Sequence, residues 1–254
     1  MASQSRRYYK SADRALLWSR SGGMCCFEGC NELCVQEANE ADLAAVIGQI
    51  GHIEAKSDSG PRANPDLSDS ERDLYPNLIL LCPTHHRLVD AQNSTHTKGT
   101  LRDWKAAQEA RFREFLAQEM GQVTFAELEI VTQALMNSGT NSPDSITVIP
   151  PLEKMARNGL TDQTAMLITI GLLLSRQVKE FIEAMGGLDD TFVTRLTSGF
   201  VTAYQAQVQD DVEGDALFEA MRLFSSQGSR EYRYQSAGLA ILVYLFEACE
   251  VFEQ

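Results

Sequence analysis

The stretch Asn77–Asp90, NLILLCPTHHRLVD, organises the N-terminal half of this 254-residue chain. Its apolar run Leu78–Leu81 leads directly into Cys82, and His85 and His86 follow before a second apolar pair. The run predicts a buried strand, and the residues after it predict the start of a helix. Sulfur and imidazole ligands at this spacing suit a divalent metal ion. The stretch therefore predicts metal ligands where a strand meets a helix.

A second group of thiols lies upstream in MCCFEGCNELC, residues 24–34. Cys25 and Cys30 bracket four residues, enough for a tight knuckle whose two sulfur atoms converge. Cys26 is the better candidate for a core residue, and Cys34 is the main rival ligand. Because the N-terminus lacks the apolar core and cleavage site of a signal peptide, we expect reduced thiols and a cytoplasmic protein.

Together the two groups predict one closed metal site. Cys25, Cys30, Cys82 and His85 would form a tetrahedral Cys3His set with no open position, which is typical of structural zinc. His86 is then available for another role, although the two adjacent histidines could exchange roles.

The segment between the thiol groups supplies a third histidine. Val46–Ala55, VIGQIGHIEA, is rich in β-branched residues and predicts a strand that delivers His52 near its end. A long polar loop follows before Asn77, and loops of that length are often functional. His96 lies in another polar loop, and we expect it to be exposed. Helices are expected at Ser11–Arg20, at His85–Asp90 and at Thr100–Met120.

The sequences GHIEA and YPNLILLCPTHHRLVD resemble the HNH (ββα-metal) endonucleases, in particular their zinc-stapled branch in bacterial restriction and defence proteins. The similarity covers about residues 20–110. It implies a DNA phosphodiester hydrolase with His52 as general base, Asn77 as the orienting amide and His86 as ligand of a catalytic Mg2+ or Mn2+. A neutral imidazole suits proton transfer from water near neutral pH.

Phosphate binding and the coordination of the catalytic cation would each require residues besides His52, Asn77 and His86. Arg62 and Arg87 are candidate phosphate contacts, because a guanidinium binds phosphate bidentately, although a solvated arginine is an equal alternative for each. Many members of the family place an Asp or His before the first histidine as a second metal ligand, and here Gly51 stands there. We expect the cation to rely on His86 with waters and substrate, or to recruit Glu54 or Asp58.

Charge is distributed unevenly along the chain. Residues 1–120 hold 14 Lys and Arg against 17 Asp and Glu, a net of −3, and the remainder holds 8 against 18, a net of −10. The first half can therefore approach a phosphate backbone, whereas the second half would be repelled by one. No apolar run is long enough to span a membrane.

The second half predicts an all-helical domain. We expect an HNH domain at 1–120, a linker rich in Ser, Asn and Pro at 121–150 and a helical domain at 151–254, which gives an α+β protein. The terminal pattern is apolar all round, as in helices buried in a core or a partner. Four helical patterns are expected, at Thr161–Met185, Asp189–Gln209, Gly214–Ser226 and Arg230–Glu253.

PPLEKMARNGL, GDALFEAM and LVYLFEACEVFEQ give this half a weaker resemblance to effector subunits of bacterial ABC three-component systems, which include Lamassu-type anti-phage defence. The resemblance implies a homo-oligomer that partners with an SMC-like ATPase and a small middle subunit. Two alternatives stay open: a standalone modification-dependent restriction endonuclease, and a non-catalytic zinc-binding adaptor.

Overall fold

The computed structural model describes residues 9–36, 42–137 and 155–248. It divides the chain into two compact units, Met1–Phe112 and Arg113–Gln254, and the division falls within helix α4 (Lys98–Met120) rather than at residue 120. The first unit combines helices with short strands and the described part of the second is helical, so the α+β class is confirmed. Among the described residues, no helix has both the length and the apolar character needed to cross a membrane.

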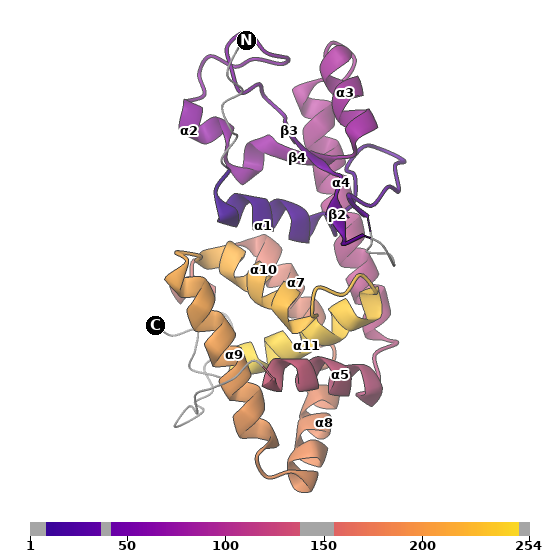
Figure 1. Cartoon of the computed structure of the whole chain (residues 1–254), viewed down its shortest axis with the longest axis vertical. Helices are drawn as coiled ribbons and strands as arrows, with labels where there is room; N and C mark the ends of the chain where they lie inside the picture. The colour runs from indigo at the N-terminus through magenta and orange to yellow at the C-terminus, as the bar shows by residue number, and fades with distance from the viewer. Residues whose placement is uncertain (1–8, 37–41, 138–154, 249–254) are drawn as a thin grey trace. The chain divides into compact units, whose positions relative to one another are not determined.

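Two antiparallel strands form the centre of the first unit (Figure 1). Strand β3 (Gln49–His52) pairs with β4 (Leu78–Leu81), and the register places His52 opposite Leu78. The strand expected over Val46–Ala55 is therefore shorter, and its first residue belongs to a separate two-stranded sheet of β1 (Val35–Gln36) and β2 (Ala45–Val46).

Helices cover this pair of strands. Helix α1 (Ser11–Arg20) has the bounds expected from the sequence and contacts β4, and α3 (Pro83–Ala91) contacts both strands. All four residues of β4 are buried, because they pack against apolar side chains such as Leu17, Ile53 and Leu101. A continuous apolar run is what a strand covered on both faces requires.

The long loop before β4 contains local structure. Helix α2 (Asp69–Arg72) begins at a capping box made by Ser68 and Glu71, and a 3-10 turn, η1 (Tyr75–Asn77), leads into β4. The guanidinium of the buried Arg72 donates to the carbonyl oxygens of Ala55, Asn64 and Leu67. The loop is therefore held by hydrogen bonds to its own backbone.

The described part of the second unit contains α5 (Phe125–Met136), α7 (Asp162–Leu172), α8 (Ser175–Leu188), α9 (Phe192–Gln209), α10 (Gly214–Ser225) and α11 (Tyr232–Ala248). The single helix expected over Thr161–Met185 is two helices, α7 and α8. Helix α5 occupies part of the expected linker and packs against α9 and α11, whereas 138–150 lies outside the described residues.

Helix α11 forms the core of the second unit. It contacts α5, α7, α8 and α10 (Figure 1). The apolar side chains in its middle, such as Leu239, Leu242 and Phe246, are buried. Of the two environments that its all-round apolar character predicts, the structure shows a protein core. The rest of the helix expected to Glu253 lies outside the described residues.

Candidate metal centre and active site

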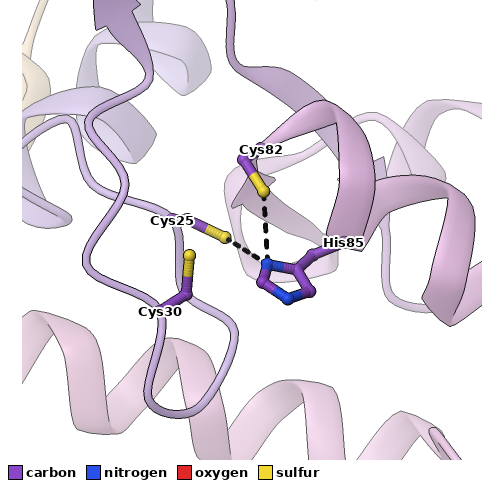
Figure 2. Close-up of side chains that lie close together, drawn as sticks. All are labelled: Cys25, Cys30, Cys82 and His85. Carbon is purple, nitrogen blue, oxygen red and sulfur yellow. Dashed lines mark hydrogen bonds between the residues drawn. The ribbon is translucent and has the colours of Figure 1, made fainter.

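Four ligand side chains gather at one point in the first unit. Their ligand atoms all lie within 4.8 Å of one another, and they belong to Cys25, Cys30, Cys82 and His85. Nδ1 of His85 is 3.2 Å from Sγ of Cys82 and 3.7 Å from Sγ of Cys25. Figure 2 shows the sulfur atoms and this nitrogen directed toward a common centre. Ligands of tetrahedral zinc lie about 3.5–3.8 Å apart, so this set can hold a structural metal ion such as zinc.

Local backbone structure brings the ligands together. Cys82 is the N-cap of α3 and Pro83 follows it, so His85 points back over the first turn toward the thiol. In the knuckle, the amide of Cys30 donates to the carbonyl oxygen of Phe27. The ring of Phe27 also stacks on His85, with ring centres 3.8 Å apart.

The pKa shifts of these ligand side chains bear on metal binding. Burial raises the pKa of the Cys25 thiol above its ordinary value, because the anion is poorly solvated there. Burial also lowers the pKa of His85, which favours the neutral imidazole that binds metals. A divalent metal ion bound here would supply the charge that stabilises the thiolates.

The remaining aromatic and sulfur groups surround this cluster without joining it. Cys26 and Cys34 are buried thiols outside the four-residue set, so the structure favours Cys30 over Cys34 as the fourth ligand. The expectation that His96 is exposed is wrong. Its side chain is buried, and its ring packs against Phe27 and Trp104.

His52 forms an ion-paired contact at the end of β3. Its Nε2 lies 2.8 Å from Oδ1 of Asp73, and Lys56 Nζ lies 3.1 Å from the other oxygen. Desolvation acts to raise the pKa of Asp73, but hydrogen bonds from His52 and Lys56 outweigh it and hold the pKa below its usual value. Asp73 is therefore an acceptor at neutral pH, so Nε2 of His52 supplies the proton of this hydrogen bond.

Asn77 holds the segment that follows His52. Its Oδ1 accepts from the amide of Glu54 at 2.8 Å, and its Nδ2 donates to the carbonyl oxygens of Glu54 at 2.8 Å and Arg72 at 2.9 Å. The side chain is buried, so all three bonds are shielded from water. Asn77 thus joins the exit of β3 to the end of α2.

His86 occupies a different face of α3 from His85. A Cβ built on Gly51 would lie 3.4 Å from Cδ2 of His86, so this imidazole packs against the strand residue that precedes His52. Its Nδ1 is 3.9 Å from Oδ2 of Asp90, one helical turn further on. The structure therefore separates the two adjacent histidines, with His85 in the metal cluster and His86 beside β3.

Arg62 does not have the geometry expected of a phosphate contact. Its side chain is only 5% exposed, and its donors are directed into the protein. They bond to the carbonyl oxygens of His52 at 3.2 Å, Ile53 at 2.9 Å and Val89 at 2.7 Å, and to Oδ1 of Asp90 at 2.8 Å. This arrangement gives Arg62 a structural role.

Arg87 and the two expected carboxylates also have defined places. Arg87 is exposed on α3, as a phosphate contact requires. The Glu54 carboxylate is buried in ion pairs with Lys98 at 3.4 Å and with Arg102. Asp58 is 2.5 Å from the guanidinium of Arg72. The carboxylate within ion-pair range of His86 is neither of these but Asp90.

The sequence did not lead us to expect the two carboxylates that contact the candidate histidines, Asp73 beside His52 and Asp90 beside His86. Asp73 lies in the polar loop, 21 residues from His52, and no local pattern connects the two. Asp90 follows His86 at the i, i+4 spacing that places two side chains on one helix face, which is a signal the sequence does contain.

The comparisons with known proteins leave this site to be interpreted from its own geometry. No model of a known protein family matches the chain. No curated protein matches it significantly either.

Proposed function

We propose that the first unit is a metal-dependent HNH endonuclease that hydrolyses DNA phosphodiester bonds. One observation carries the proposal: the imidazole of His86 packs against Gly51, the residue directly before His52. His86 on α3 therefore contacts strand β3 at the residue next to His52, and in this proposal the two imidazoles serve one phosphodiester as base and metal ligand. Asn77 holds the chain where it leaves this arrangement.

His52 acts as the general base in this proposal. Its Nδ1 takes a proton from the water that attacks phosphorus, and Asp73 stabilises the imidazolium that forms. The bond from phosphorus to the leaving oxygen breaks, and that oxygen takes up a proton from solvent. His86 would hold a Mg2+ or Mn2+ ion, which when bound supplies charge stabilisation to the phosphoryl and leaving oxygens.

The Cys3His cluster supports this site structurally. It joins the Cys25 knuckle to the residue after β4, and β4 pairs with the strand that carries His52. We propose that zinc occupies the cluster and fixes the relative positions of strand and helix. Because all four ligand positions are filled by protein groups, this ion would have no open position for substrate.

DNA is the substrate in this proposal because exposed cations accompany the site. Arg87 lies on the exposed surface of α3, next to His86 in sequence. Lys98 and Arg102 together place two positive charges against the single carboxylate of Glu54, and both side chains are about half exposed. A locally positive surface attracts a phosphate backbone despite the acidity of the whole chain.

For the second unit we propose an assembly role, as the effector subunit of a multi-component anti-phage system with an SMC-like ATPase and a small middle subunit. Exposed apolar side chains on its helices and in the turn between α7 and α8, including Met166, Leu173 and Leu188, offer contacts to a second copy or a partner. Light scattering of the full chain tests the homo-oligomer. A mass equal to one chain would contradict it.

Cleavage of supercoiled plasmid by the zinc-loaded full-length protein tests the nuclease proposal. We expect cleavage with Mg2+ or Mn2+ and a loss of about 10²–10⁴-fold in His52→Ala, since a general base contributes about that much. Asn93→Ala, a change at an exposed residue of the same unit, serves as control. The assay is run with the chain alone and with its genomic neighbours.

Zinc content and circular dichroism must match between His52→Ala and the parent protein. Equal cleavage by both would refute the catalytic assignment of His52. An absence of cleavage in every condition, with zinc bound, would instead favour a non-catalytic zinc-binding adaptor.

A further inference from the structure

We propose that Asp90 is the second protein ligand of the cation held by His86, and that Arg62 is the residue that positions Asp90. The inference rests on the proposed nuclease site, and it names a ligand that replaces the one missing at Gly51. It also assigns Arg62 a function in place of phosphate binding.

His86 and Asp90 lie on one face of α3. Nδ1 of His86 and Oδ2 of Asp90 are 3.9 Å apart. Two ligands of one octahedral Mg2+ lie about 3.0 Å apart when adjacent and about 4.2 Å apart when opposite, so this pair is within reach of a shared ion. The Asp90 side chain is 42% exposed and that of His86 is 17% exposed. The pair therefore faces solvent on one side, where waters and phosphate oxygens can complete the coordination.

Strand β3 lies against His86 at Gly51. Gly51 is buried, and a Cβ there would meet His86, Ile79 and Leu81 at 3.3–3.5 Å. Gly51 itself offers no side-chain ligand, and its neighbours already occupy van der Waals contact distance around the Cβ position. A protein carboxylate for the ion therefore comes from another element in this proposal, and α3 presents one beside His86.

Arg62 holds the carboxylate of Asp90 in place. Its Nη2 donates to Oδ1 of Asp90, which leaves Oδ2 as the oxygen toward His86. The same guanidinium bonds to the carbonyl oxygens of His52, Ile53 and Val89, so it joins the end of β3 to the end of α3. A buried arginine that fixes one carboxylate oxygen and spans both elements sets the distance between the base and the cation ligands.

The backbone of Arg62 supports this assignment. Its φ is +59°, in the left-handed region that is unfavourable for a non-glycine residue. The side chain bonds stabilise that conformation. An ordinary exposed i, i+4 pair between His86 and Asp90 contributes little to stability and would need no such support.

Mn2+ binding tests the inference directly. The free Mn2+ signal in electron paramagnetic resonance is titrated with zinc-loaded full-length protein in the absence of DNA. We expect one site whose affinity falls about 10- to 100-fold or more in Asp90→Asn, because loss of outer-shell groups alone has effects of that size. Asp103→Asn, at an exposed position on α4, should bind as the parent does.

Two further variants separate ligation from folding. Asp90→Glu keeps a carboxylate and should retain Mn2+ binding within about 10-fold of the parent. Arg62→Lys keeps the positive charge but loses the planar guanidinium that bonds to several acceptors at once. Because Arg62 positions Asp90 in this proposal, the variant should weaken Mn2+ binding about 10- to 100-fold. Zinc content of each variant is measured alongside.

The outcomes are distinct from those of the nuclease proposal. Parental Mn2+ affinity in Asp90→Asn, or a parent that binds zinc but no Mn2+, overturns the inference even where His52-dependent cleavage is observed. Loss of Mn2+ in Asp90→Asn and in His86→Ala, without any cleavage by the parent, supports the cation site and refutes the nuclease.

Discussion

Nε2 of His52 lies 2.8 Å from Oδ1 of Asp73, and the second oxygen of that carboxylate is bonded by Lys56. The pair couples the proposed base to a residue outside the strands. Asp73→Asn removes the negative charge that stabilises the imidazolium. We expect cleavage at neutral pH to fall by about 10- to 100-fold, less than in His52→Ala.

The pH profile of cleavage distinguishes this role from a purely structural one. Without the carboxylate the pKa of the essential base should fall, so the acidic limb of the profile should move to lower pH. Asp69→Asn, whose side chain is fully exposed on α2, should leave the profile unchanged. A parental profile in Asp73→Asn would exclude the coupling.

Asn77→Ala should destabilise the first unit by about 2–4 kcal/mol, because three buried hydrogen bonds are lost and their backbone partners stay buried. Asn77→Asp keeps the acceptor but loses both donors, so it should not restore stability. Both tryptophans, Trp18 and Trp104, lie in this unit, and their fluorescence in urea reports its unfolding. An unfolding midpoint equal to that of the exposed Asn93→Ala would contradict this prediction.

Cys82→Ser should abolish zinc binding and unfold the first unit, since a structural zinc ion contributes on the order of 10 kcal/mol. Most of the helical signal of the second unit should persist. Metal analysis and tryptophan fluorescence measure the two effects. The thiols outside the cluster are the controls: Cys26→Ala and Cys34→Ala should each retain one zinc per chain. Zinc loss in Cys34→Ala alone would mean that the ligand set is different.

Lys105 predicts a pH dependence of stability. Its Nζ lies 3.5 Å from the ring centre of Tyr75, and burial lowers its pKa from 10.5 to about 8. Above pH 8 the unfolded chain holds a proton that the folded chain has released, so stability rises with pH. The buried thiols Cys26 and Cys34, with pKa values raised by burial from 9.0 to about 12, oppose this from about pH 8 upward, because their unfolded forms begin to ionise there.

We therefore expect Lys105 by itself to contribute a gain of about 1 kcal/mol in unfolding free energy between pH 8 and 9, up to a limit of about 1.4 kcal/mol per pH unit, and the two thiols to reduce the net gain of the parent protein. Lys105→Met should lose that gain. Urea unfolding at the two pH values, followed by tryptophan fluorescence, measures it. An equal change in unfolding free energy between the two pH values in the parent and in Lys105→Met would mean that Lys105 does not titrate in this range.

Gly199 marks the tightest helix contact in the described part of the second unit. A Cβ there would lie 1.8 Å from the carbonyl oxygen of Leu135, so Gly199→Ala must separate α9 from α5. We expect a loss of at least about 1–3 kcal/mol in thermal unfolding followed by circular dichroism. Gly187→Ala on α8 meets no atom within 4 Å and should be neutral or stabilising. Similar melting of the two variants would contradict the contact.

Local pattern was sufficient for much of the first unit. The apolar run before Cys82 predicts β4 because a strand covered on both faces has no polar positions. Helix α1 begins at Ser11 as expected, although Lys10 rather than a capping Ser11 stands at its N-cap. Cysteine spacing predicts the Cys3His set because one ion needs its ligands in two close pairs. The break between α7 and α8 was not predictable, since apolar periodicity continues through it.

The sequence by itself determined the class of the fold, the strand that leads into Cys82 and the two close pairs of candidate ligand positions, because each depends on residues close together in the chain. Only the tertiary structure decided which of two adjacent histidines joins the cluster, since neighbours on a helix face different directions and the surroundings select between them. It also brought Asp73 to His52 and placed Arg62 between β3 and Asp90. These contacts join residues that are distant in sequence, and ion pairing across a fold leaves no local pattern.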